Sequence, residues 1–294
     1  MKTTRSAILC ALLAAGLYAL NAPISKLLLA QTAPTMMAAL LYLGAGLGMT
    51  AVWLCRKALK QYDPALRLTK KELPYTLGMI ALDIAAPILL MLGLSLTTAE
   101  NAALLNNFEI VATTLIALLL FGERVSPRLW LAIGLITASS MLLSVEGARS
   151  LSFSLGSVFV LLACACWGLE NNCTRKLSVK DPLEIVAVKG LCSGAGSLIV
   201  AFVMGEALPS AVFLLAALLL GFVAYGLSIF FYVTAQRTLG AAKTSAYYAV
   251  APFLGAGLSL LIFRTPPPAS FWLALLVMAV GAWLATADSF REQA

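Results

Sequence analysis

The amino-acid sequence repeats itself. Residues 97–135 align without a gap with residues 239–277 at an offset of 142, which places Trp130 opposite Trp272. An earlier pair of segments aligns in the same way at an offset of 149. A repeat of this kind restricts the fold to architectures that are built from two related units.

Both units are mostly apolar. Hydrophobic residues make up 61% of the 294 residues and charged residues 11%, whereas soluble domains average about 45–50% and about 25%. Apolar stretches of about 20 residues, long enough to cross ~30 Å of hydrocarbon, recur along the whole chain. We place them at 6–29, 33–55, 73–95, 98–121, 127–145, 155–176, 183–204, 209–235, 241–263 and 270–288.

The predicted fold is therefore an all-α membrane protein with ten transmembrane helices. Five helices fall in each unit, residues 1–147 and residues 148–294. Because five is odd, the second unit enters the membrane from the opposite side, and the two repeats are inverted relative to each other. The substrate sites of secondary transporters form where such repeats face each other.

The distribution of positive charge predicts the orientation in the membrane. With the N-terminus inside, sixteen Lys and Arg residues lie on the inner side and two, Arg149 and Arg264, on the outer side. The inner residues are Lys2, Arg5, Arg56, Lys57, Lys60, Arg67, Lys70, Lys71, Arg124, Arg128, Arg175, Lys176, Lys180, Arg237, Lys243 and Arg291. Cytoplasmic loops accumulate such residues, so we expect a multi-pass protein of the plasma membrane with both termini cytoplasmic. Topology, and not nucleic-acid binding, then explains the net charge of +7.

The sequence indicates no cofactor and no metal site. None of the six cysteines forms a Cys-x-x-Cys pair, and the chain has no histidine. The missing histidine excludes Ser-His dyads and His-based metal sites. The apolar run at the N-terminus continues to Leu29, too long for the h-region of a cleaved signal peptide.

Three carboxyl groups are predicted inside the membrane: Asp83, Glu109 and Glu170. A charge at the centre of a transmembrane helix costs roughly 2.5–3.5 kcal/mol on insertion scales. Such residues usually face the bundle interior and are functional candidates. Glu109 is the first candidate for a proton-carrying group and Asp83 the second, while Glu170 could simply be neutralised by Arg175 or by a neighbouring polar group.

Three other charged residues have structural interpretations. Lys26 and Lys189 lie about two turns or less from predicted helix ends, so their side chains could reach the membrane interface. Glu100 is expected at the outer mouth, where it could cap the fourth helix.

Polar and aromatic residues form stripes at helical spacing. The sets Tyr18-Asn21-Ser25, Asn106-Glu109-Thr113 and Trp167-Glu170-Thr174 share the spacing i, i+3, i+7, which places each set on one helix face. The stripes predict an aromatic-lined central cavity for a small-molecule substrate. Its predicted residues are Tyr18, Asn21, Asn106, Trp167, Asn171, Tyr225, Tyr232 and Tyr248. The alternative for the amides and hydroxyls is that they only hydrogen-bond neighbouring helices.

Glycine and proline add packing information. Gly44-x-x-x-Gly48 and Gly190-x-x-x-Gly194 have the spacing that lets membrane helices approach closely. Prolines at 23, 87 and 252 fall inside predicted helices, where they are expected to cause kinks.

Residues 95–136 and 236–277 resemble the drug/metabolite transporter superfamily in its EamA-type form. The resemblance includes Glu109-Ile110, where the family has a Glu-Pro-like step, and Ala251-Pro252 at the same place in the second unit. The pair Gly122-Glu123 ends the first motif, whereas Arg264-Thr265 replaces it in the second. Tyr18, Trp167-Gly168 and Lys189 also fit, while Tyr42 departs from the pattern.

The resemblance covers the whole chain and implies a ten-helix secondary transporter of two inverted five-helix repeats. It further implies that the fifth and tenth helices are peripheral, and that the substrate is an amino acid, metabolite or drug-like solute. We expect export by alternating access, with protons as the coupling ion. The alternatives are a receptor or scaffold without transport, a channel, and an intramembrane enzyme, which the missing histidine disfavours. The sequence does not indicate the oligomeric state.

Overall fold

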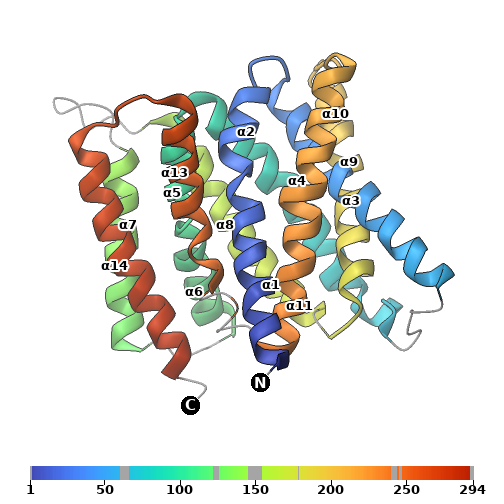
Figure 1. The fold of residues 1–294 in the computed structure, drawn as a ribbon, viewed down its shortest axis with the longest axis horizontal. Helices are drawn as coiled ribbons and strands as arrows, with labels where there is room; N and C mark the ends of the chain where they lie inside the picture. Colours follow the sequence, from blue (N-terminus) through green and yellow to red (C-terminus); the bar gives the residue numbers. More distant parts are fainter. Residues whose placement is uncertain are drawn as a thin grey trace.

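The fold is helical throughout the described part of a computed structural model (Figure 1). The structure describes residues 2–59, 66–121, 126–144, 154–177, 179–239, 244 and 247–291, and no strand occurs among them. The elements in chain order are α1 (Lys2–Ala19), α2 (Asn21–Leu28), α3 (Pro34–Ala58), the 3₁₀ turn η2 (Lys70–Glu72), α4 (Leu73–Leu96), α5 (Ala99–Leu105), α6 (Phe108–Phe121), α7 (Pro127–Ser144), α8 (Leu155–Leu177), α9 (Pro182–Val203), α10 (Ala211–Leu220), the π-helical segment η3 (Gly221–Leu227), α11 (Ser228–Leu239), α13 (Ala251–Phe263) and α14 (Ala269–Arg291).

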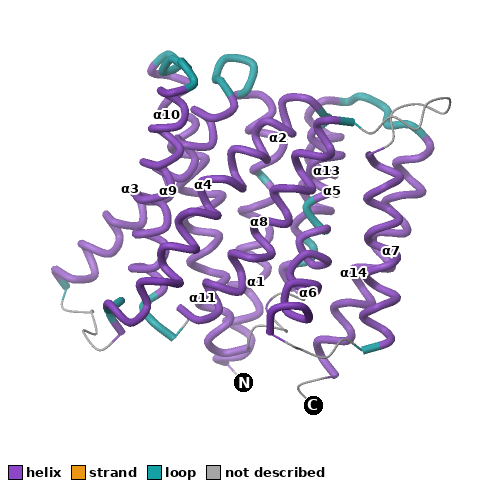
Figure 2. Tube along the Cα trace, turned by 180° about the vertical axis from the view of Figure 1, so that it is seen from behind, coloured by secondary structure: helices purple, strands orange, loops and turns teal. Residues whose placement is uncertain are grey.

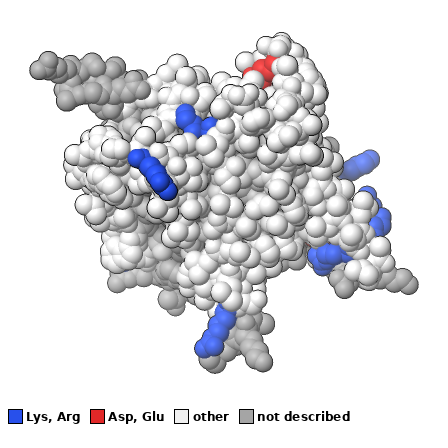
Figure 3. Space-filling view, turned by 45° about the horizontal axis from the view of Figure 1, so that its top comes forward, with Lys and Arg blue, Asp and Glu red and all other residues white. Residues whose placement is uncertain are grey.

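Eight helical stretches of the described chain are long and apolar enough to cross a membrane. They are Thr4–Leu28, Pro34–Ala58, Lys70–Leu96, Pro127–Ser144, Leu155–Thr174, Pro182–Val203, Ala211–Ala235 and Ala269–Ala287. Large apolar side chains point outward from the helices, as Val203 of α9 does at 82% exposure and Leu119 of α6 at 78%. The face in Figure 3 carries few charged groups. Such a surface suits hydrocarbon rather than water.

The other two predicted spans are not single long helices. The span 98–121 is divided into α5 and α6 by a turn at Asn106 and Asn107. In the span 241–263, the helix α13 begins at Ala251, and part of the chain before it lies outside the described residues. The count of ten spans therefore stays a prediction beside the eight that the structure describes.

Proline explains one further interruption and leaves a second helix intact. Pro23 has no backbone N–H to donate to the carbonyl group of Ala19, and the first span breaks at Leu20 between α1 and α2. Pro87 lies inside α4, which continues without a break. Pro252 lies inside α13 as predicted, but in its first turn, a position that tolerates proline without a kink.

Glycine lets α3 pack between two neighbours. A Cβ atom on Gly46 would lie 2.4 Å from the backbone nitrogen of Leu191 in α9, and one on Gly190 would lie 2.3 Å from the nitrogen of Gly46. Gly44 and Gly48 instead face α10 and η3, where a Cβ would meet Leu218 or Phe222 at 2.0 Å. The predicted Gly44–Gly48 motif of α3 therefore packs against α10 and η3. The close contact of α3 with α9 is made by Gly46 instead.

The outermost pair of helices lies apart from the interior. In Figures 1 and 2, α7 and α14 run side by side at one edge of the bundle. Ser139 in α7 donates a hydrogen bond of 2.6 Å to the carbonyl oxygen of Ala274 in α14. The same figures show that α1 begins and α14 ends at one end of the bundle.

Candidate substrate site

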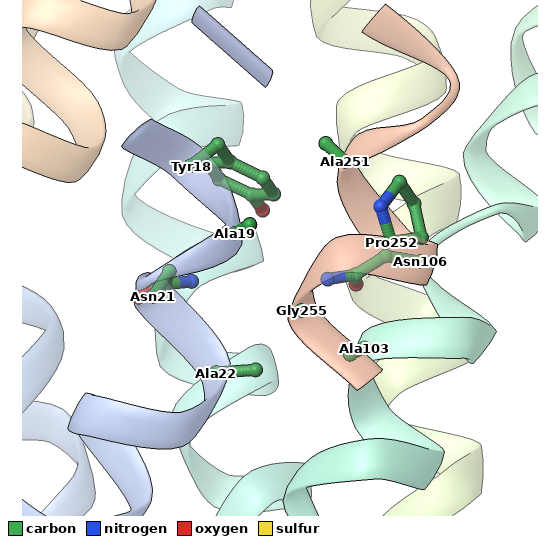
Figure 4. Close-up of a pocket in the computed structure, with 9 residues that line it drawn as sticks. All are labelled: Tyr18, Ala19, Asn21, Ala22, Ala103, Asn106, Ala251, Pro252 and Gly255. Carbon is green, nitrogen blue, oxygen red and sulfur yellow. The ribbon is translucent and has the colours of Figure 1, made fainter. Parts of the chain in front are cut away.

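A small cavity lies where the interrupted helices meet. Its volume is about 10 Å³, about the space that one water molecule needs. The lining residues are Tyr18, Ala19, Asn21, Ala22, Ala103, Asn106, Ala251, Pro252 and Gly255. In Figure 4, the residues of α1 and α2 face those of α13 across the cavity, while Ala103 comes from α5 and Asn106 from the turn that follows α5.

The interruptions give this cavity a polar wall. The break at Leu20 adjoins Asn21, the turn at Asn106 ends α5, and Ala251 begins α13. Under the offset of 142, Asn107 matches Ala249, and both lie in a turn, so two of the three interruptions overlap in the repeat. Helix ends leave backbone N–H and C=O groups without helical partners, and discontinuous helices supply such groups to substrate sites in transporters.

Asn21 is held in place from both sides. Its amide nitrogen donates a hydrogen bond of 3.0 Å to the hydroxyl oxygen of Tyr225, and its oxygen accepts one of 2.9 Å from Ser25. Tyr225 lies in the π-helical segment η3, and π-helical turns occur frequently at functional sites. This network fixes the orientation of the amide beside the cavity.

Tyrosine rings surround the same region. The ring of Tyr18 lies 5.8 Å from that of Tyr225 and 5.9 Å from that of Tyr248, and Tyr232 packs against Tyr248 at 4.9 Å. These separations are typical of aromatic pairs. On the other side of the group, Tyr42 packs against Tyr225 at 5.2 Å. Tyr42 was named above only as a departure from the family pattern, although its position inside an apolar span was a signal of an interior role.

Glu109 lies beside this aromatic group without a cationic partner among the described residues. Asn171 in α8 donates a hydrogen bond of 2.6 Å to its carboxylate and contacts the Thr113 hydroxyl at 3.4 Å. Glu109 also lies within electrostatic range of Tyr18 and Tyr248. The predicted stripes on the fourth and sixth spans therefore face each other, and Asn171 contacts Glu109 rather than the cavity.

The other two membrane carboxyl groups form a separate cluster with a lysine. Lys189 Nζ lies 3.0 Å from Asp83 Oδ2 and 3.1 Å from Glu170 Oε1. Tyr42 donates a hydrogen bond of 2.8 Å to Asp83, and Thr174 donates one to Glu170. Trp167 interacts with the Tyr42 hydroxyl through its indole, so this predicted cavity residue belongs to the charged cluster.

The interpretation of Lys189 as a residue that reaches the interface was therefore wrong. Its side chain is 8% exposed and points into the bundle, because two carboxylates compensate its charge there. Lys189 pairs with Glu170, while the side chain of Arg175, the other expected partner of Glu170, lies outside what the structure describes. Glu170 lies seven residues before the end of α8, and Lys189 lies seven residues after the start of α9. Equal distances from the connection between two consecutive helices were the signal that could have found this pair.

Lys26 instead caps a helix. Its ammonium group donates hydrogen bonds of 2.6 Å to the carbonyl oxygens of Leu94 and Thr97, at the C-terminal end of α4, where a positive charge is favourable. Glu100 lies in the first turn of α5, where a carboxylate is favourable for the same reason.

Comparison with known proteins agrees with this architecture. The model of the EamA-like transporter family matches residues 5–145 and again residues 154–287. The chain belongs to this family. It is accordingly a multi-pass membrane protein of a transporter family, as the resemblance to the drug/metabolite transporter superfamily implied.

Individual relatives support the same assignment. An uncharacterized transporter from Methanothermobacter thermautotrophicus is 25% identical over 290 residues, which cover 91% of this chain and 82% of the relative. A solved crystal structure has a TM-score of 0.70 at 20% sequence identity and covers 98% of both chains. That likeness concerns the fold alone.

Proposed function

We propose that this protein carries a small solute outward across the plasma membrane by alternating access. In this proposal the chain crosses the membrane ten times as two inverted five-helix repeats, residues 1–147 and 148–294, with both termini in the cytoplasm. The observation that carries the proposal is the cavity between interrupted helices, two of which are interrupted at matching repeat positions. Interrupted segments in corresponding positions are the best indicator of a transporter's binding site.

The size of the cavity supports a closed state of the transport cycle. About 10 Å³ is far below the ~300–1,000 Å³ of typical small-molecule sites. Two hydrogen bonds lie at the end of the bundle where α4 and α9 begin. The backbone N–H of Asp181 donates a hydrogen bond of 2.9 Å to the carbonyl oxygen of Leu66, and the carboxylate of Glu184 accepts one of 3.0 Å from the backbone N–H of Leu68. These bonds join residues 5–145 to residues 154–287, the two stretches that the family model matches. Solute entry from that end therefore requires the two stretches to separate.

The substrate we propose is a cationic, zwitterionic or neutral amphipathic solute such as an amino acid, metabolite or drug-like compound. Tyr18, Tyr225, Tyr232 and Tyr248 would stack on its apolar part, while Asn21 and Asn106 orient its polar part. Three carboxyl groups near the cavity disfavour anions. Trp167 and Asn171 support the site from outside, through Tyr42 and Glu109.

We further propose that Glu109 exchanges protons during transport. A carboxyl group away from bulk water takes up a proton more readily than one in water, and no ammonium or guanidinium of the described chain lies within ion-pair distance of Glu109. Proton and solute would compete for one region of the protein. Competition of this kind lets an inward proton gradient drive a solute outward, which is why we propose export.

A thermal-shift screen on the purified protein identifies the solute, because a compound that binds only the folded state must stabilise it. Flux of that compound into proteoliposomes then separates a transporter from a receptor or scaffold, which would bind without flux. Conversion of the compound into a product would indicate an enzyme.

The coupling role is tested with Glu109→Gln in the same vesicles. We expect gradient-driven accumulation to fall to the level without a gradient, while exchange of labelled for unlabelled solute persists. Glu100→Gln, another acid of the same span, is the matched control and should keep the gradient response. If Glu109→Gln concentrates solute as well as the wild type, Glu109 is not the coupling group.

A further inference from the structure

Small residues line the cavity where the other unit of the repeat has polar side chains. Three matched pairs differ in this way: Glu109 and Ala251, Thr113 and Gly255, both at the offset of 142, and Asn171 and Ala22 at the offset of 149. The small member of each pair lines the cavity. The polar members contact one another instead, because Asn171 donates hydrogen bonds to Glu109 and to Thr113. The cavity is therefore the open counterpart of a polar cluster.

Close packing does not require the glycine at position 255. A Cβ atom on Gly255 would lie 3.3 Å from the Cβ atom of Ala103 and 3.3 Å from the carbonyl oxygen of Ala19, so the neighbours would have to shift by only a few tenths of an ångström. On Gly44 or Gly48 the same atom would lie 2.0 Å from its neighbour. Glycine at position 255 thus keeps the cavity open and leaves the Ala19 oxygen uncovered.

The carbonyl oxygen of Ala19 is a hydrogen-bond acceptor at this cavity. Pro23 has no N–H to donate to it. The backbone hydrogen bonds at the break between α1 and α2 are accepted by the oxygens of Leu17 and Leu20. A carbonyl group that lacks its helical partner and adjoins a cavity is available to a ligand.

Asn106 provides a hydrogen-bond donor to the same cavity. The residue is 8% exposed, and its amide nitrogen is directed toward α1 and α2 (Figure 4). Its side-chain oxygen lies 4.0 Å from the thiol of Cys164, whereas the nitrogen donates no hydrogen bond to any described residue. Buried amide donors normally have a partner, so Asn106 indicates that a ligand places an acceptor in the cavity.

We propose that the cavity binds a hydroxyl group of the transported solute. A hydroxyl group can donate to Ala19 and accept from Asn106, whereas an ammonium group cannot accept and a carboxylate cannot donate. It also fits a volume of about 10 Å³, which is about the space of one water molecule. In the other unit, Thr113 at the position of Gly255 provides a hydroxyl that accepts from Asn171. The inference rests on the proposed function and names the chemistry of its solute.

Three probes of similar shape test the inference on the purified full-length protein. 2-Phenylethanol donates and accepts hydrogen bonds, its methyl ether only accepts, and 2-phenylethylammonium only donates. All three carry the same phenyl group, which suits the tyrosine rings around the cavity. Calorimetry should show that the alcohol binds about tenfold tighter, or more, than either analogue, because each analogue leaves one buried polar group unpaired.

Two substitutions should remove the preference for the alcohol over the ether by different routes. Gly255→Ala covers the Ala19 oxygen with a methyl group, and Pro23→Ala adds an N–H that can donate to this oxygen. Gly257→Ala, in the same helix, is the control for the first, because a Cβ atom there meets nothing within 4 Å. Pro87→Ala, at a proline inside α4, is the control for the second. Both controls should keep the preference.

Gly255→Ser places a hydroxyl group of the chain itself in the cavity. This variant should no longer bind the alcohol, and thermal unfolding checks that it is folded; Gly255→Ala serves the same purpose if it is not. The inference is overturned if the ether or the ammonium binds as tightly as the alcohol, if none of the three probes binds, or if Gly255→Ala and Pro23→Ala keep the preference. Flux of a different solute would then still support a transporter, so the two failures are distinguishable.

Discussion

At the scale of single residues, position inside the bundle decides what a polar group does. Lys26 and Lys189 are both about two turns or less from a helix end in the sequence, yet Lys26 caps α4 and Lys189 binds two buried acids. Asn21 and Asn171 are both amides inside predicted spans, and the sequence predicted the same role in the cavity for both. One lies at the cavity wall and the other contacts Glu109.

Replacing Asn21 by alanine should impair binding more than folding. The variant loses the hydrogen bonds to Tyr225 and from Ser25, each worth about 1 kcal/mol or less between membrane helices. We expect the thermal shift produced by the identified solute to disappear, while the unfolding temperature without solute falls by a few degrees. Asn101→Ala, outside the cavity lining, is the control. An unchanged solute response in Asn21→Ala would remove this residue from the site.

Replacing Lys26 by methionine should destabilise the protein without affecting the solute response. The ammonium group donates to carbonyl oxygens at the end of α4, and hydrogen bonds from charged groups contribute about 1.5–3 kcal/mol. Thermal unfolding in detergent measures the loss. The exposed Lys176 provides the control variant Lys176→Met, whose unfolding temperature should match the wild type; equal values for both variants would contradict the capping role.

At the scale of elements, close backbone contacts place α3 between α9 on one side and α10 with η3 on the other. Glycine is required at these contacts because a Cβ atom would overlap backbone atoms of the neighbouring helix. The arrangement brings Tyr42 of α3 and Lys189 of α9 into the same cluster. Packing of these helices and the geometry of the charged cluster are therefore linked.

Alanine at Gly46 or Gly190 should force α3 and α9 apart. Overpacking of this kind costs about 1–3 kcal/mol, and more where backbone atoms must shift. Gly134→Ala is the matched control, since a Cβ there meets nothing within 4 Å and alanine raises helix propensity by about 1 kcal/mol. Thermal unfolding should rank both contact variants below the wild type and Gly134→Ala at or above it. A contact variant as stable as Gly134→Ala would refute the close packing.

At the scale of the whole molecule, the repeat and the charge asymmetry predict one orientation. The start of α1 and the end of α14 lie at the same end of the bundle (Figure 1), as an even number of crossings requires. The exposed apolar side chains around the bundle are suited to lipid.

Single cysteines introduced at residues 60, 149 and 264 test the orientation. In a background without the six native cysteines, a membrane-impermeant thiol reagent applied to intact cells should label positions 149 and 264 and leave position 60 unlabelled. Position 60 should react only after the membrane is opened. Labelling of residue 60 from outside would reverse the proposed topology.

Sequence alone determined the features that depend on composition and periodicity. Apolar stretches of span length predicted the all-α membrane class, and the twofold motif around Glu109 and Ala251 predicted the family, which the family comparison confirmed. Both depend on local properties of the chain: hydrophobicity must match the bilayer along each span, and a repeat is visible without knowledge of contacts.

Only the tertiary structure decided which side chains meet. Spacing could place Trp167 and Asn171 on one face of α8, but that face lies against Tyr42 and Glu109. Lys189 could be placed on α9, but its partners lie on α4 and α8. Such pairings depend on how helices distant in sequence rotate and pack against each other, and a periodic pattern within one helix specifies its inward face without specifying which residues of another helix that face will contact.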